Sequence, residues 1–167
     1  MKRIFRTLLL GLVMAATSLA HAGAFTDAAE NKIADAILRG QALGVPATWY
    51  IGLTTDTCTD AGNGTEPSGN NYARVAVTSS LANWAGTQSA GSTTASSGTG
   101  GTSSNNGTIA FAASTGSWGT VQAVRWYDAS TAGTAWICIN LTASINDSGS
   151  GYTLSFPATT LSVQVDN

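Results

Sequence analysis

From Pro46 onward, apolar side chains recur at every second position in seven short runs. The runs cover residues 49–53, 73–77, 109–113, 121–126, 135–141, 152–156 and 161–165. This period of two places each apolar set on one face of a strand, and clusters of Gly, Asn, Asp and Ser separate the runs as turns do. The pattern therefore predicts a mainly β chain, an antiparallel β-sandwich of the jelly-roll-like kind.

One short helix is predicted ahead of the strands, over residues 26–39. Thr26 is placed to cap its N-terminus, and Gly40 is placed to end it. Its apolar face consists of Ala29, Ile33, Ala36 and Ile37. Because this face is narrow and rich in alanine, we expect the helix to pack at one end or edge of the sandwich.

The first 22 residues have the features of a secretory signal peptide. A basic start is followed by an apolar run at residues 8–16 and by Ala20-His21-Ala22, which fits the small-x-small cleavage pattern. The apolar run is too short to span a bilayer, and no later segment is apolar enough to do so. We therefore expect a secreted protein, exported through the periplasm to the cell surface or medium, with one domain over residues 23–167 and no membrane span in the mature chain.

The charge of the mature chain argues against two classes of function. Nine acidic and four basic residues remain after Ala22, a net charge of about −5. Binding to nucleic acid needs clustered Lys and Arg, so no nucleic-acid partner is expected. The mature chain also lacks histidine and has Lys32 as its one lysine, which removes most acid/base and nucleophilic machinery. We therefore expect no catalytic residues and no enzyme.

Two cysteines, Cys58 and Cys138, fit an oxidising compartment. The simplest interpretation of this pair is one intrachain disulfide. Their separation of 80 positions, without a histidine nearby, does not suit a metal site.

A segment of unusual composition occupies residues 86–107. It consists almost entirely of Gly, Ser, Thr, Ala and Asn, with no apolar residue larger than alanine. Such a segment cannot offset the entropy of its own ordering by burial, so we expect a flexible, exposed loop outside the core. Either a solvated spacer or a binding loop fits this composition.

An acidic loop over residues 56–66 is the one candidate cation site. Its oxygen-bearing side chains are Asp56, Asp60, Asn63 and Glu66. Oxygen ligands on a Gly-rich loop suit Ca²⁺, although the spacing does not match an EF-hand. The alternative is a polar turn whose side chains bond to their own backbone. No other cofactor is expected.

Five tryptophans are many for a chain of this length. Trp118, Trp126 and Trp136 are candidates for an interface between subunits or for stacking on sugar rings. Trp126 and Trp136 lie opposite the more regular apolar sets of their strands, which leaves exposure open. The alternative is that these indoles fill the second face of a buried sheet.

The stretch over residues 62–77 contains Gly64-Thr-Glu66, then Tyr72-Ala-Arg74. In this it resembles a family of small phage virion proteins, of the tail fibre or minor tail type. Similar order and spacing extend over residues 25–166, including 46–53 and Ser117-Trp118-Gly119. The resemblance implies a β-sandwich subunit that assembles in many copies and has no catalytic site.

The signal peptide and the cysteine pair depart from that phage pattern, because virions assemble in the cytoplasm. Together they suggest a phage-type structural module that is exported and self-assembles into a surface or extracellular homo-oligomer or filament. Its partners would then be copies of itself. The alternative function is a secreted carbohydrate-binding or adhesive module whose partners are surface glycans.

Overall fold

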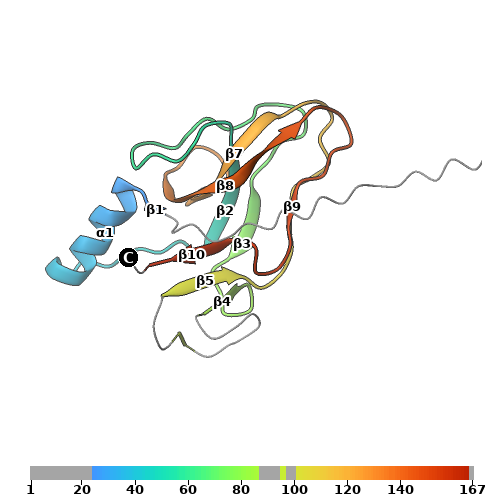
Figure 1. Ribbon diagram of the computed structural model, residues 1–167. Helices are drawn as coiled ribbons and strands as arrows, with labels where there is room; N and C mark the ends of the chain where they lie inside the picture. The colour runs from blue at the N-terminus through green and yellow to red at the C-terminus, as the bar shows by residue number, and fades with distance from the viewer. Residues whose placement is uncertain (1–23, 87–94, 97–100, 166–167) are drawn as a thin grey trace, which may run out of the picture.

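The computed structural model describes residues 24–86, 95–96 and 101–165. The predicted signal peptide lies outside these residues, as do positions 87–94 and 97–100 of the predicted loop. The described chain is mainly β, with antiparallel sheets and one short helix (Figure 1). The prediction of an antiparallel β-sandwich with one N-terminal helix is confirmed.

Each of the seven predicted runs overlaps a strand. The elements in chain order are β1 (Ala24–Phe25), α1 (Asp27–Arg39), β2 (Thr48–Thr54), β3 (Val75–Thr78), β4 (Trp84–Ala85), β5 (Thr102–Asn105), β6 (Ile109–Ala110), β7 (Gly119–Tyr127), β8 (Ala135–Asp147), β9 (Ser155–Phe156) and β10 (Ser162–Gln164). Three of the short strands, β1, β4 and β5, were not predicted by the alternation.

The strands form three groups. The largest sheet has the order β1-β8-β7-β2-β3, so β1 and β3 are its two edges. The smaller groups are a three-stranded sheet, β10-β5-β4, and a two-stranded one, β6-β9. Every pairing between the described strands is antiparallel.

The core lies between the large sheet and the two smaller groups. From the large sheet it takes Ile51, Leu53, Val121, Val124, Trp126 and Ile139. From the opposite side it takes Ile109, Phe111, Trp118, Leu154, Phe156 and Leu161. Burial of such aliphatic and aromatic side chains is worth about 1.5–3 kcal/mol each, so this layer is the main source of stability.

The helix α1 packs at the edge of the large sheet formed by β1 and β8, and Figure 1 shows it at one end of the molecule. This confirms its predicted place, but two expectations about it are wrong. The Thr26 side chain does not cap the helix, because its hydroxyl is buried and donates to the Ala135 carbonyl at 2.7 Å. Ile37, expected on the packed face, is 74% exposed, and only Ala29 of α1 is fully buried. The helix therefore attaches to the sheet mainly through its first turns.

The prediction that residues 86–107 lie outside the core is wrong at the C-terminal end of the segment. Strand β5 pairs with β4 on one side and β10 on the other. Asn105 at its end is 1% exposed. Its side chain donates to the Gly107 and Pro157 carbonyls and accepts the Leu161 N–H at 2.9 Å. A polar strand is thus fixed here by hydrogen bonds rather than by apolar burial.

Candidate functional site

Residues 55–66 fold over the face of the large sheet that points away from the core, whereas Tyr72 packs against the core residues Phe111 and Trp118. The Cys58–Cys138 disulfide joins this loop to β8, which confirms the predicted pairing. Beside the bridge, the Cys58 N–H donates to the Asn140 side chain at 2.8 Å. The loop is therefore attached to the sheet covalently and through its backbone.

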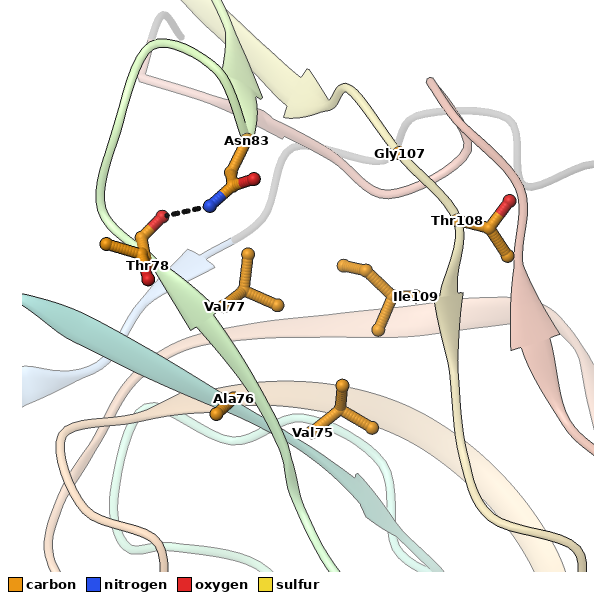
Figure 2. A pocket seen from close by; sticks show the side chains of 8 residues that line it. All are labelled: Val75, Ala76, Val77, Thr78, Asn83, Gly107, Thr108 and Ile109. Atoms are coloured by element: carbon orange, nitrogen blue, oxygen red, sulfur yellow. Dashed lines mark hydrogen bonds between the residues drawn. The ribbon is translucent and has the colours of Figure 1, made fainter.

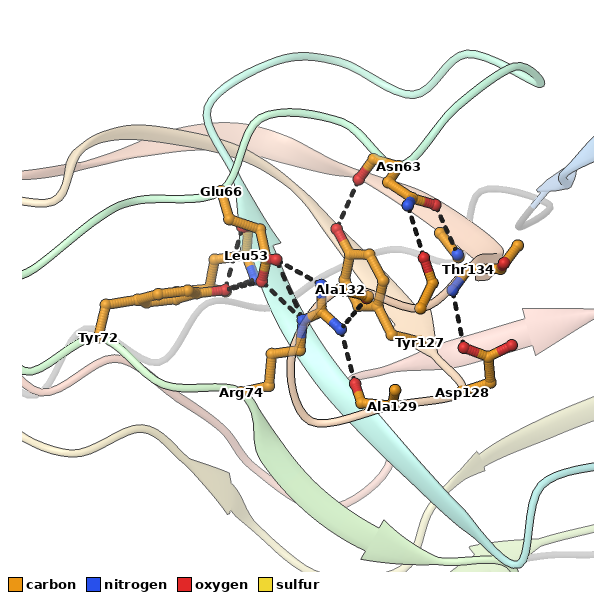
Figure 3. A network of polar contacts seen from close by, with 12 residues as sticks. Leu53, Asn63, Glu66, Tyr72, Arg74, Tyr127, Asp128, Ala129, Ala132 and Thr134 are labelled. Atoms are coloured by element: carbon orange, nitrogen blue, oxygen red, sulfur yellow. Dashed lines mark hydrogen bonds and ion pairs between the residues drawn. The ribbon is translucent and has the colours of Figure 1, made fainter.

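A polar network lies beneath this loop, centred on Glu66, Tyr72 and Arg74 (Figure 3). The Arg74 guanidinium donates to the Glu66 carboxylate, with Nη2 2.5 Å from Oε2 and Nε 3.0 Å from Oε1. The Tyr72 hydroxyl donates to the same carboxylate at 2.7 Å and accepts the Leu53 N–H at 2.7 Å. Charge-assisted bonds of this kind are about twice as strong as neutral ones.

The other side of Arg74 faces the β7–β8 hairpin. Its guanidinium carbon lies 3.4 Å from the centre of the Tyr127 ring, a cation–π contact. Its Nη1 donates to the carbonyls of Ala129 and Ala132 at 2.6 and 2.9 Å. One side chain, 5% exposed, thereby connects the loop, the sheet and the hairpin.

Gly52 of β2 lies in the sheet directly beneath this network. A Cβ at this position would lie 2.7 Å from both Glu66 Oε1 and the Tyr127 ring. Real Cβ atoms do not approach other atoms so closely, so only glycine leaves room for the carboxylate against the sheet.

The network changes the ionisation of two tyrosines. Burial, helped by the Glu66 carboxylate, raises the pKa of Tyr72 well above its usual value of about 10. Burial also raises the pKa of Tyr127, with Glu66 as the next cause. Both hydroxyls are therefore protonated donors at any physiological pH, which suits a structural role.

A second buried cation lies under the same loop. Arg125 of β7 is fully buried and lies 3.9 Å from the Asp56 carboxylate. A Cβ on Gly64 would come within 2.5 Å of Arg125 Nε, and Gly64 has φ +71°, a conformation that favours glycine. The backbone of Gly64 thus covers the guanidinium directly.

The structure does not bring the four calcium candidates together. Glu66 is bonded to Arg74, and the second oxygen of Asp56 accepts the Thr65 N–H at 2.8 Å. The Asn63 amide bonds to the Gly133 carbonyl and to the Ala135 N–H, while Asp60 is exposed. Within the described residues, no group of three or more His, Cys, Asp or Glu side chains could hold a metal ion. The bond from the Thr65 N–H to Asp56 is of the kind expected for a polar turn.

For Trp126 and Trp136, the structure favours the alternative in which the indoles are buried. Trp118, Trp126 and Trp136 are 4%, 2% and 5% exposed within the single chain. The reason is a pair of β-bulges: register shifts between Val121 and Ala123 and beside Trp126 change which face each side chain takes. Trp126 consequently joins the core, and Trp136 packs edge-on against Trp49 with ring centres 5.4 Å apart. No face of these indoles is open to a sugar ring.

Two clefts lie among the described residues. The first, of about 240 Å³, runs along β3 and reaches Ile109 (Figure 2). The second, of about 390 Å³, lies between Ser79 and Trp84 and reaches Ser96 and Ser103. No Asp, Glu, His, Cys, Lys or Arg side chain lines either cleft. Neither contains the groups that acid/base chemistry requires.

In the described part of this β-sandwich, Arg74 and Arg125 are used for internal packing. The sequence matches the family of Podophage GP4 fiber I protein gp80 over residues 24–164, from the first residue of β1 to the last of β10. The chain therefore belongs to this phage fibre family and is a phage-type structural protein, as the resemblance implied. A comparison with curated proteins found no match.

Glu66, Tyr72 and Arg74 carry the resemblance to phage virion proteins, but their shared role was not predicted. The composition of the loop instead suggests Glu66 as a calcium ligand. The signal that could have indicated the network is a carboxylate followed closely by Tyr-x-Arg, because Arg74 is the one basic residue between positions 40 and 124.

Proposed function

We propose that this chain is a non-enzymatic structural subunit that associates with copies of itself into a fibre-like or surface assembly. The observation that carries the proposal is the extent of the family match, which spans the whole sandwich rather than one motif. The internal use of Glu66, Arg74 and Arg125 supports the non-enzymatic role, because these groups are already committed to packing.

The distribution of positive charge supports self-association. Among the described residues, the exposed basic side chains are Lys32 and Arg39, both on α1. The edge strands β3, β4 and β10 contain no Lys or Arg. Soluble monomers commonly protect strand edges with such charges, so edges without them are consistent with surfaces that are covered in an assembly.

Export to the cell surface or medium remains part of the proposal. It is supported by the signal-peptide pattern of residues 1–22 and by the Cys58–Cys138 bridge, which is typical of oxidising compartments. No helix in the described part of the chain is long and apolar enough to cross a membrane. Intact mass of protein recovered from the periplasm should correspond to a chain that starts at Gly23 and contains one disulfide; an uncleaved chain in the cytoplasm would contradict export.

Negative-stain electron microscopy of the purified, oxidised protein tests the structural role. Filaments or rings are expected, and a field of single small particles at high concentration would contradict it. A glycan array on the same sample tests the adhesive alternative. The three indoles that are candidates for sugar stacking are buried within the chain, so we expect no glycan binding.

A further inference from the structure

The cleft along β3, called the seam below, lies between the large sheet and the two-stranded group β6-β9. Val75 and Val77 of β3 are only half-buried, and their side chains face Ile109 of β6 across the cleft in Figure 2. At about 240 Å³ the cleft is smaller than the roughly 300–1,000 Å³ typical of small-molecule sites. Its floor is aliphatic, which suits a few apolar side chains rather than a polar metabolite.

The backbone on both rims of the seam is turned toward it. The Ser79 N–H donates to the Ala47 carbonyl, so in the β2–β3 ladder the N–H and C=O of Ala76 point away from β2. The Phe111 N–H donates to the Leu154 carbonyl, so the same groups of Ala110 point away from β9. The sandwich is therefore not closed at this edge by any described strand.

An exposed apolar pair lies at the other edge of the large sheet. Ile37 and Leu38, in the last turn of α1, are 74% and 82% exposed and have the largest exposed fractions among the described large apolar side chains. The nearest charges, Asp35 and Arg39, bond to each other at 2.8 Å. The end of the helix thus presents two aliphatic side chains next to a neutralised ion pair.

The two features are complementary and lie on opposite edges. The helix packs at the edge formed by β1 and β8, whereas the cleft follows β3, the strand at the far edge of the same sheet. We propose that Ile37 and Leu38 of one copy bind in the cleft between β3 and β6 of a second copy. This inference rests on the proposed function and names the interface that would carry it.

The lack of unpaired charge on both surfaces is compatible with a second copy as the occupant. A mature chain with a net charge of about −5 repels its own copies, so a stable contact between copies has to bury uncharged surface. Both surfaces meet this condition, because no charged side chain lines the cleft and the helix end carries a paired Asp35 and Arg39. The contact joins two different surfaces, so it repeats from copy to copy and builds a filament or a ring.

The test uses two surface variants of the full, processed protein. The helix variant combines Ile37→Lys with Leu38→Lys, which keeps good helix formers near a C-terminus that favours cations. The cleft variant combines Ala76→Lys with Thr108→Lys, two exposed positions on the rims. The control combines Asn31→Lys with Val165→Lys, which adds the same charge at exposed positions outside both surfaces.

Each of the two variants should weaken self-association by at least about tenfold in sedimentation velocity, whereas the control should associate like the wild type. An equimolar mixture of the two variants should form heterodimers and nothing larger, because one intact helix end and one intact cleft remain. Far-UV circular dichroism and thermal melting confirm that each variant is folded.

The possible failures are distinguishable. If the wild type associates and both variants associate equally well, or if the mixture gives no heterodimer, the interface is wrong and the proposed function stands. If the wild type itself is monomeric, the proposed function is wrong, and the interface fails with it.

Discussion

Arg74 and Glu66 form a bidentate ion pair beneath a loop, with the Arg74 guanidinium lying on the ring of Tyr127. The pair connects a loop, a sheet face and a hairpin that are distant in the sequence. Its carboxylate, which the sequence suggests as a metal ligand, is committed to the interior of the protein.

Replacing Arg74 by methionine should destabilise the protein by about 3 kcal/mol, because it leaves the Glu66 carboxylate partly buried without its cation. The double variant, Arg74→Met with Glu66→Gln, should cost less than the single one. Urea denaturation followed by tryptophan fluorescence measures both. As a control, Arg39→Met removes an exposed ion pair and should cost no more than about 0.5 kcal/mol. Equal effects at Arg74 and Arg39 would contradict the role assigned to the network.

Stability should fall at high pH. The pKa values of Tyr72 and Tyr127 are raised in the folded protein, so the unfolded chain releases protons first as the pH passes about 10. The two hydroxyls contribute fully to the free energy of unfolding below that pH. Above it, this contribution falls by up to about 1.4 kcal/mol per pH unit for each tyrosine. Urea denaturation between about pH 8 and about pH 11 measures the slope. Tyr72→Phe should remove about half of it, and a flat profile for the wild type would contradict the burial of these hydroxyls.

The disulfide should contribute about 4–5 kcal/mol, since it closes a loop over a sequence separation of 80 residues in the unfolded chain. The double variant, Cys58→Ala with Cys138→Ala, should lose this much stability and unfold at a lower denaturant midpoint than the oxidised wild type. Wild-type protein in a reducing agent should behave like the variant. Unchanged stability after verified reduction would show that the bridge constrains nothing.

Asn105→Ala should destabilise the fold by about 3 kcal/mol, because the buried amide supplies partners to the Leu161 N–H and to the carbonyls of Gly107 and Pro157. Asn31→Ala, at an exposed position on α1, is the control and should have little effect. Thermal melting compares the two variants. Similar behaviour of both would mean that the end of β5 is not fixed to the core.

The alternation in the sequence predicted β2, β7 and β8 because each strand has apolar residues at every second position, on a face that packs in the core. It missed β5 because Thr102–Asn105 contains no apolar residue and is stabilised by hydrogen bonds to β10 and to Leu161. The burial of Trp126 could not be predicted from the alternation, because a bulge shifts the period of two within β7. Bulges depend on the partner strand, which a single run of residues does not contain.

The polar network could not be predicted from the local sequence pattern for a similar reason. Glu66 in a Gly-rich loop has the composition of a surface turn, and nothing near it in the sequence shows that a sheet lies beneath it. The disulfide, by contrast, could be predicted from the number of cysteines together with the predicted signal peptide.

Self-association is tested most directly by sedimentation velocity of the oxidised, processed wild-type protein over a wide range of concentrations. We predict species larger than the monomer, whose proportion and size increase with concentration. A single species of monomer mass at every concentration would contradict the proposal that this chain is a self-assembling structural subunit.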